Sequence, residues 1–157
     1  MIVSVSGTPG TGKTGTARAL AESVGWELIE LNKLASKKRL YLGYDKGREC
    51  RIVDIEGVKK EVEKLRSSGK NLILESHYAH DMPCDVAVIL RARPSELRKR
   101  LAERGWKTSK IDENVQAEIM EVCKSDATEQ GKEVLEIDTT GKAPALVAGE
   151  IRKKLKF

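Results

Sequence analysis

The chain has 157 residues and a formal net charge of +5, and 34% of its residues are charged while only 4% are aromatic. This length predicts a single domain with an aliphatic core, and the basic balance favours anionic partners such as nucleotides or a ribonucleoprotein surface. The separated cysteines argue against a zinc site or disulfide framework, and the lack of a leader or a long apolar run predicts a soluble cytoplasmic protein with no membrane partner.

Hydrophobic periodicity predicts strands that alternate with helices. The expected strands are 2–6, 26–29, 71–75, 85–91 and 133–137, and the expected helices are 12–24, 31–39, 55–68, 95–104 and 144–155. The glycines and polar residues of 40–54 predict irregular chain. One more helix is expected after Ser109 and Asp112, which have the spacing of a capping box. Its apolar stripe would be Ile111, Val115, Ile119 and Val122.

This alternation predicts one α/β domain over residues 1–157, with three α/β/α layers and a mainly parallel five-stranded sheet. Repeats, low-complexity tracts and linkers are absent from the sequence. The expected fold is that of a P-loop NTPase, because of the motif that follows the first strand.

Residues 7–14 read Gly-Thr-Pro-Gly-Thr-Gly-Lys-Thr and match the Walker A pattern between a predicted strand and a predicted helix. Glycines in such a loop turn backbone N–H groups toward a phosphate, and the helix dipole adds positive potential. Lys13 is expected to reach the β- and γ-phosphates of ATP, and the Thr14 hydroxyl to bind Mg²⁺. The glycines expected to form the cradle are Gly10, Gly12 and Gly15.

The strand predicted at 71–75 ends in an acid, as in a Walker B motif. Glu75 is therefore a candidate to hold Mg²⁺ beside the P-loop and to take part in catalysis, or else a strand-end acid that faces solvent. His77 could orient water or sense the γ-phosphate, or else be a polar surface residue. His80 is expected at the surface.

From Gly7 to about Gln130 the chain resembles the adenylate kinase isoenzyme 6 type, a family of broad-specificity nucleoside monophosphate kinases. The resemblance is carried by the P-loop and by three further stretches, "LYLGYDKGRECRIVD", "ILESHYAHDMP" and "RLAERGWKTSKIDENVQAEIM". The family has Asp where this chain has Glu75, and the extra methylene would move the carboxylate by about 1 Å and alter the metal geometry.

The resemblance implies two short inserts, a segment that binds the nucleoside monophosphate (NMP) at about 30–53 and a lid at about 103–113. Arg104 matches the family's lid arginine, which offsets charge on the transferring phosphoryl group. Lys142 stands where the family packs adenine, and His77 matches a histidine tied to ATP hydrolysis and partner release. From the residues alone, Arg98, Arg100 and Arg104 also fit a solvated helix face, and Lys142 an ordinary surface lysine.

The monophosphate side is less well defined. Adenylate kinases use an arginine on the second helix to grip the monophosphate, and Arg39 is the candidate here, with Lys37 and Lys38 beside it. A solvated basic run explains the same three residues. The sequence does not fix the helix register, so this alternative stays open.

The resemblance implies transfer of the γ-phosphoryl group of ATP–Mg²⁺ to AMP or another NMP, with ATPase activity and a role in 16S rRNA and small ribosomal subunit maturation. The alternative is an ATP-gated assembly factor that binds and releases the small-subunit platform protein, the eleventh universal protein of that subunit, in transient contact with the pre-30S particle. A shikimate- or gluconate-type kinase shares the P-loop and the size, but the "LYLGYD" and "RGWKTSKIDEN" stretches count against it.

Overall fold

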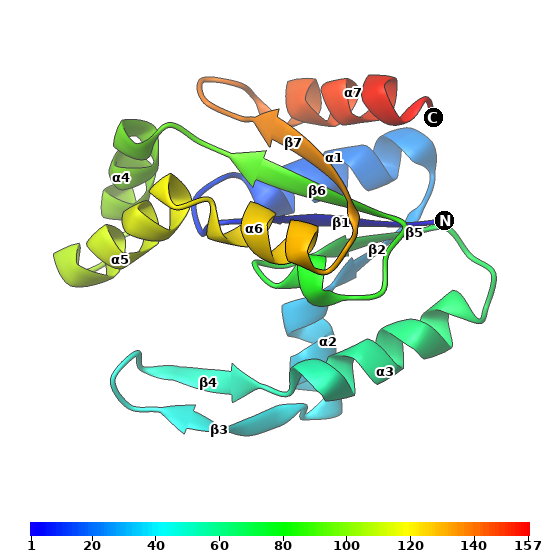
Figure 1. Ribbon diagram of the computed structural model, residues 1–157, viewed down its shortest axis with the longest axis horizontal. Coiled ribbons are helices and arrows are strands. Elements are labelled where there is room, and N and C mark those ends of the chain that lie inside the picture. The colour runs from blue at the N-terminus through cyan, green and yellow to red at the C-terminus, as the bar shows by residue number, and fades with distance from the viewer.

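The apolar runs of the sequence form one parallel sheet in the computed structural model, which describes all of residues 1–157 (Figure 1). The strand order is β2-β5-β1-β6-β7, and every neighbouring pair is parallel. The strands are β1 (Ile2–Gly7), β2 (Glu27–Glu30), β5 (Leu72–Glu75), β6 (Val86–Arg91) and β7 (Glu133–Asp138). The predicted five-stranded α/β fold is thereby confirmed.

Helices cover both faces of this sheet, which gives three layers. On one face, α1 (Lys13–Val24) and α7 (Pro144–Leu155) pack on alternate residues of the central strands. The other face is covered by α2 (Leu31–Lys38), α3 (Ile55–Arg66), the short 3-10 helix η1 (Ala79–Asp81) and α6 (Val122–Glu129). Because β5 and β6 are buried on both faces, they read as nearly continuous apolar runs, whereas the equally buried β1 carries two serines.

Two helices project from the end of the sheet at which the strands finish (Figure 1). They are α4 (Pro94–Glu103) and α5 (Thr108–Ile119), and they pack on each other through a small apolar cluster. Trp106 in the connection joins this cluster, and the Lys110 ammonium lies 4.1 Å from the centre of its ring. No helix of the chain combines the length and apolar character that a membrane crossing requires.

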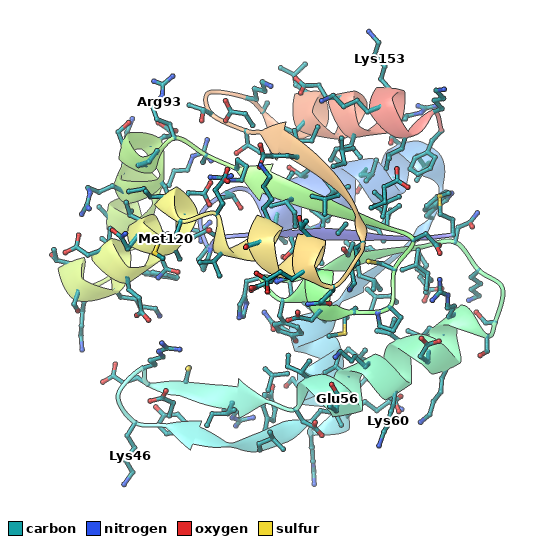
Figure 2. All side chains as sticks on the ribbon, in the orientation of Figure 1. Lys46, Glu56, Lys60, Arg93, Met120 and Lys153 are labelled. Carbon is teal, nitrogen blue, oxygen red and sulfur yellow. The ribbon has the colours of Figure 1, made fainter.

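The segment 40–54, predicted to be irregular, is a β-hairpin. Strands β3 (Tyr41–Asp45) and β4 (Cys50–Val53) pair in antiparallel fashion, with a register shift between Tyr41 and Gly43. This bulge breaks the alternation from which a strand is read in a sequence, so the prediction was wrong. Lys46 lies at the outer tip of the hairpin (Figure 2).

The helix predicted to carry a stripe from Ile111 to Val122 is in fact two helices. The chain turns between α5 and α6, where Met120 lies and Glu121 has a φ of 55° (Figure 2). Ile119 is consequently 56% exposed, outside the core in which the stripe placed it. The capping-box prediction was also wrong, because α5 begins at Thr108 and no side chain caps its N-terminus.

Candidate active site

The P-loop crosses from the end of β1 to the start of α1 and lies against α4. Gly10 has a φ of 93°, and a Cβ atom there would lie 2.7 Å from Cδ1 of Leu97. Gly12 has a φ of 86° and caps the N-terminus of α1. Side chains at these two positions would push the loop off α4 or strain its backbone, so glycine is required on physical grounds. The helix N-terminus and loop amides form an anion-binding site.

Lys13 lies back along its own loop. Its Nζ donates a hydrogen bond to the carbonyl oxygen of Thr8 at 3.1 Å. Burial lowers the pKa of the Lys13 ammonium to about 8; the Arg104 guanidinium also lowers it, whereas the Glu75 carboxylate acts in the opposite direction. A polyphosphate at the loop would supply the countercharge that this ammonium lacks.

Thr14, in the first turn of α1, meets Glu75 at the end of β5. Glu75 is the last residue of β5, in register with Val5 of β1, and is 8% exposed. Oγ1 of Thr14 donates to its Oε1 at 3.3 Å. Burial raises the pKa of the Glu75 carboxyl, against the Lys13 ammonium and the hydrogen bond from Thr14. A hydroxyl and a carboxylate side by side are hard oxygen ligands, so the pair fits Mg²⁺.

A cavity of about 360 Å³ opens between the P-loop, α4 and the start of α7. It brings together four residues singled out in the sequence, Gly10, Gly12, Arg104 and Lys142. In the structure Lys142 forms an ion pair with Glu150 at 2.9 Å. Gly15 lies at the edge of the cavity, where a Cβ atom would be 3.0 Å from Cγ of Pro144.

Arg100 lines the same cavity and ties the P-loop to the segment after β7. Its Nη1 donates to the carbonyl oxygen of Gly10 at 3.2 Å, and its Nη2 to that of Thr139 at 3.3 Å. In turn, Oγ1 of Thr139 donates to the carbonyl oxygen of Thr11 at 3.0 Å. Two cations from one helix, Arg100 and Arg104, therefore face the phosphate loop.

The two histidines have different surroundings. The ring of His77 lies edge-on against the ring of Tyr78, and a part of the residue remains in contact with solvent. Partial desolvation by the surrounding chain, together with the Lys13 ammonium, lowers its pKa to about 4. The ring is thus neutral at pH 7. The surface expectation for His80 was wrong: it is 4% exposed, and its Nδ1 lies 2.6 Å from Oγ of Ser6. Ser6 immediately precedes the P-loop, so the hydrogen bond to His80 helps to fix the start of that loop.

Arg39 lies apart from this assembly. It caps the C-terminus of α2 with a φ of 55° and is exposed, and no hydrogen bond or ion pair links it to the P-loop. The structure therefore brings the P-loop residues, Glu75 and Arg104 together but does not add Arg39 to them. Its grip on a monophosphate stays a prediction.

Two ion pairs join the hairpin to the helical pair α4–α5. Nη2 of Arg48 lies 2.8 Å from Oε1 of Glu113, and Nζ of Lys107 lies 3.7 Å from Oε2 of Glu49. All four side chains are largely exposed, and each such pair contributes at most about 1 kcal/mol. They show that the hairpin and the helical pair α4–α5 are in contact at their exposed ends.

Sequence reasoning missed one buried acid at the site. Glu118 of α5 is 3% exposed and accepts a hydrogen bond from the hydroxyl of Thr8 in the P-loop at 2.6 Å. It stands one turn after Val115 on the buried stripe of α5, where an apolar residue is expected. A charged residue within an apolar stripe was the signal that could have identified it.

Comparisons with known proteins agree on the type of domain. A family model described as an AAA domain matches residues 3–121. A Pyrococcus furiosus protein named "Putative adenylate kinase" is 42% identical over 151 residues, which make up 96% of this chain and 82% of that protein. A protein of the same name from Thermococcus onnurineus is 41% identical over 156 residues, covering 99% and 84% of the two chains.

Solved structures share the fold at lower identity. Shikimate kinase from Acinetobacter baumannii, in complex with shikimate, aligns with a TM-score of 0.67 at 17% identity over 99% of this chain and 93% of that one. Deoxyadenosine kinase from M. mycoides aligns with a TM-score of 0.65 at 14% identity over 99% of each chain. At these identities the likeness concerns the fold alone.

Proposed function

The chain belongs to the AAA domain family whose model matches residues 3–121, and proteins named "Putative adenylate kinase" are about 40% identical to it; from this premise we propose that it is a nucleoside monophosphate kinase of the adenylate kinase isoenzyme 6 type. The reaction is transfer of the γ-phosphoryl group from ATP–Mg²⁺ to AMP or another NMP. The observation that carries the proposal is the group of charged residues around the P-loop: Lys13, the Thr14–Glu75 pair and Arg104.

The donor side follows from the P-loop and its cavity. The loop amides and the Lys13 ammonium would bind the β- and γ-phosphates of ATP, and the cavity lined by Arg100 and Lys142 is placed to receive the adenosine. Thr14 and Glu75 would hold Mg²⁺, which neutralises charge on the phosphates when bound.

The acceptor would bind between the hairpin and the helical pair α4–α5. We assign the NMP-binding insert to about 30–53, which contains the hairpin, and the lid to about 103–113, which contains the α4–α5 connection. The ion pairs between these segments support closure over the acceptor. Arg39 remains the candidate for the acceptor phosphate.

The chemistry requires positioning more than acid–base catalysis. An oxygen of the acceptor phosphate, already deprotonated at pH 7, would attack the γ-phosphorus as the bond to the β–γ bridging oxygen breaks and ADP leaves. The Arg104 guanidinium is placed to offset charge on the transferring group. A neutral His77 is available to orient water, which would account for ATP hydrolysis without an acceptor.

The test is production of ADP from ATP–Mg²⁺ with and without AMP, followed by CMP, UMP and dAMP in place of AMP. We expect AMP to raise ADP production at least tenfold, and Lys13→Ala to abolish most of this increase. A Lys99→Ala variant on the exposed side of α4 is the control for loss of one positive charge. ADP production that ignores every monophosphate would refute the proposal.

A second candidate is the ATP-gated assembly factor. The hairpin favours it through its exposed apolar residues, because Leu42 is 73% exposed and Ile52 lies on the neighbouring strand with 45% exposure. The measurement is ATP turnover with the purified platform protein of the small ribosomal subunit. Turnover that changes with this protein but not with AMP would favour the assembly factor, and Leu42→Ser should then weaken the effect.

A further inference from the structure

We propose that Glu118 is a positioning residue for phosphoryl transfer: through the hydroxyl of Thr8 it fixes the P-loop to the far end of α5. The inference rests on the proposed function only in taking the P-loop as the site of nucleotide binding. It adds a residue that the Walker motifs do not contain and that touches no phosphate.

The Glu118 carboxylate is buried and fully hydrogen-bonded. Its Oε2 accepts from Oγ1 of Thr8 at 2.6 Å, and its Oε1 accepts from Nε of Arg91 at 2.6 Å and from the backbone N–H of Ala92 at 3.1 Å. A buried carboxylate with three short, directed bonds has little freedom to move, because losing any one of them leaves a polar atom without a partner.

Thr8, which is hydrogen-bonded to Glu118, also accepts a hydrogen bond from Lys13. The carbonyl oxygen of Thr8 accepts from Nζ of Lys13 at 3.1 Å, and also from the backbone N–H and the hydroxyl of Thr11 at 3.2 and 2.8 Å. The side chain of Thr8 is thus hydrogen-bonded to α5, while its carbonyl oxygen binds Lys13 and Thr11 within the loop. Rotation of Thr8 would therefore move the carbonyl oxygen against which the Lys13 ammonium rests and alter the shape of the loop.

Arg91 fixes the other end of the arrangement. Besides Glu118, its guanidinium bonds the carboxylates of Glu121 at 2.7 Å and Glu136 at 3.0 Å, and its Nη2 donates to the backbone carbonyl oxygen of Glu118 at 2.8 Å. This last bond caps the end of α5 beside the turn at Met120 (Figure 2). The C-terminal end of α5 is therefore fixed on β6 and the P-loop.

The decisive comparison is between two substitutions of Thr8. Thr8→Val keeps the shape of the side chain but removes the hydroxyl, whereas Thr8→Ser keeps the hydroxyl. We expect Thr8→Val to lower kcat about tenfold to a hundredfold with KM for the acceptor within about twofold of wild type, because a small misplacement of a catalytic group reduces the rate by such factors. Thr8→Ser should restore kcat to within about threefold.

A second pair of substitutions tests the Glu118 carboxylate directly. Glu118→Gln removes the charge from the carboxylate that binds Thr8, and Glu121→Gln removes the same charge from another partner of the same arginine. We expect Glu118→Gln to lower kcat at least tenfold and Glu121→Gln to leave it within about twofold. If Glu118→Gln fails to fold, the Thr8 pair decides the question alone.

Calorimetric affinity for ADP–Mg²⁺, measured on all four variants, separates this inference from the proposed function. If the wild type phosphorylates no monophosphate, the function fails, but Thr8→Val should still weaken ADP binding relative to Thr8→Ser. Equal kcat and equal ADP affinity for these two variants would overturn the inference. The inference would also be overturned if kcat and ADP affinity fell only in proportion to the melting temperature, with no difference between Thr8→Val and Thr8→Ser or between Glu118→Gln and Glu121→Gln.

Discussion

The Arg104 guanidinium lies in the cavity beside the P-loop and close enough to Lys13 to lower the pKa of that ammonium. The two cations repel each other, the Glu75 carboxylate offsets a part of this repulsion, and the charge on the transition state of phosphoryl transfer would relieve the rest. The arrangement should therefore favour the reacting nucleotide over the unreacted one.

Arg104→Ala is expected to lower kcat about a hundredfold or more while changing ADP–Mg²⁺ affinity only a few-fold, since the arginine would act on charge that develops during transfer. The control is Arg98→Ala on the same helix, where the side chain is half exposed and bonds Asp112 at 2.6 Å. Steady-state kinetics and calorimetry measure the two effects. Equal losses in kcat and affinity would assign Arg104 a simple binding role.

His80 should make stability depend on pH. Burial lowers the pKa of His80 below the unfolded value of 6.5. The carboxylates of Asp81 and Asp126 act to raise this pKa, whereas the Lys132 ammonium acts to lower it. As the pH falls through 6.5, the unfolded chain takes up a proton that the folded chain does not, so the free energy of unfolding should decrease, by at most about 1.4 kcal/mol per pH unit.

Urea unfolding at pH 7.5, 6.5 and 5.5 measures this slope. His80→Asn keeps a polar group near Oγ of Ser6 but cannot titrate, so its slope should be shallower than that of the wild type. His77, whose pKa is also lowered, supplies a part of the slope that the variant retains. Identical slopes for His80→Asn and wild type would contradict the assignment.

At the scale of elements, the P-loop packs closely against α4 at Gly10. Gly10→Ala would place a methyl group against Leu97 and Leu101 in a backbone conformation that L-residues disfavour. We expect loss of at least tenfold in ADP affinity together with about 1–3 kcal/mol of stability. Gly25→Ala, with a φ of 69° and open space around it, should lose stability by about 1–2 kcal/mol with unchanged affinity.

The sequence predicted those elements whose signals are local. Buried strands, the proline-started helices α4 and α7 and the glycine-rich loop were placed within a residue or two. The hairpin β3–β4 was missed because a bulge disturbs its alternation. The break between α5 and α6 was missed because Arg91, from a strand distant in the sequence, caps α5 there. A local pattern contains no information on such a partner.

In the candidate site, too, residues with a local sequence signal could be predicted, and residues that depend on distant partners could not. Motif residues that are consecutive in the chain, from Gly10 to Gly15, and the acid at the end of β5 could be named in advance. Arg100, Thr139 and Glu118 join the P-loop only through hydrogen bonds between distant segments. His80 was misjudged because its partner, the hydroxyl of Ser6, lies 74 positions away.

At the scale of the whole molecule, the sheet is the element on which both helical layers depend, and β1 is its central strand. Two buried serines of β1 differ in whether their hydroxyl groups have hydrogen-bond partners. Ser4 is fully buried and its Oγ has no hydrogen-bond partner, whereas Oγ of the equally buried Ser6 donates to the carbonyl oxygen of His77 at 3.1 Å.

Ser4→Ala is therefore expected to raise the free energy of unfolding by about 1 kcal/mol, because it removes a polar atom that lost its hydration without gaining a partner. Ser6→Ala should lower it by about 1–3 kcal/mol, since Nδ1 of His80 then loses its partner. Chemical denaturation measures both. A loss of stability in Ser4→Ala similar to that in Ser6→Ala would contradict this account.

The central place of β1 also governs how the molecule is made. Ile2 lies beside Leu72 and Val3 beside Val86, so β1 borders strands that are synthesised much later than β1 itself. Such distant pairings slow folding, and until they form, an apolar segment stays open to wrong neighbours. Translation paused before β6 should leave the nascent chain sensitive to protease, and release beyond it should bring protection.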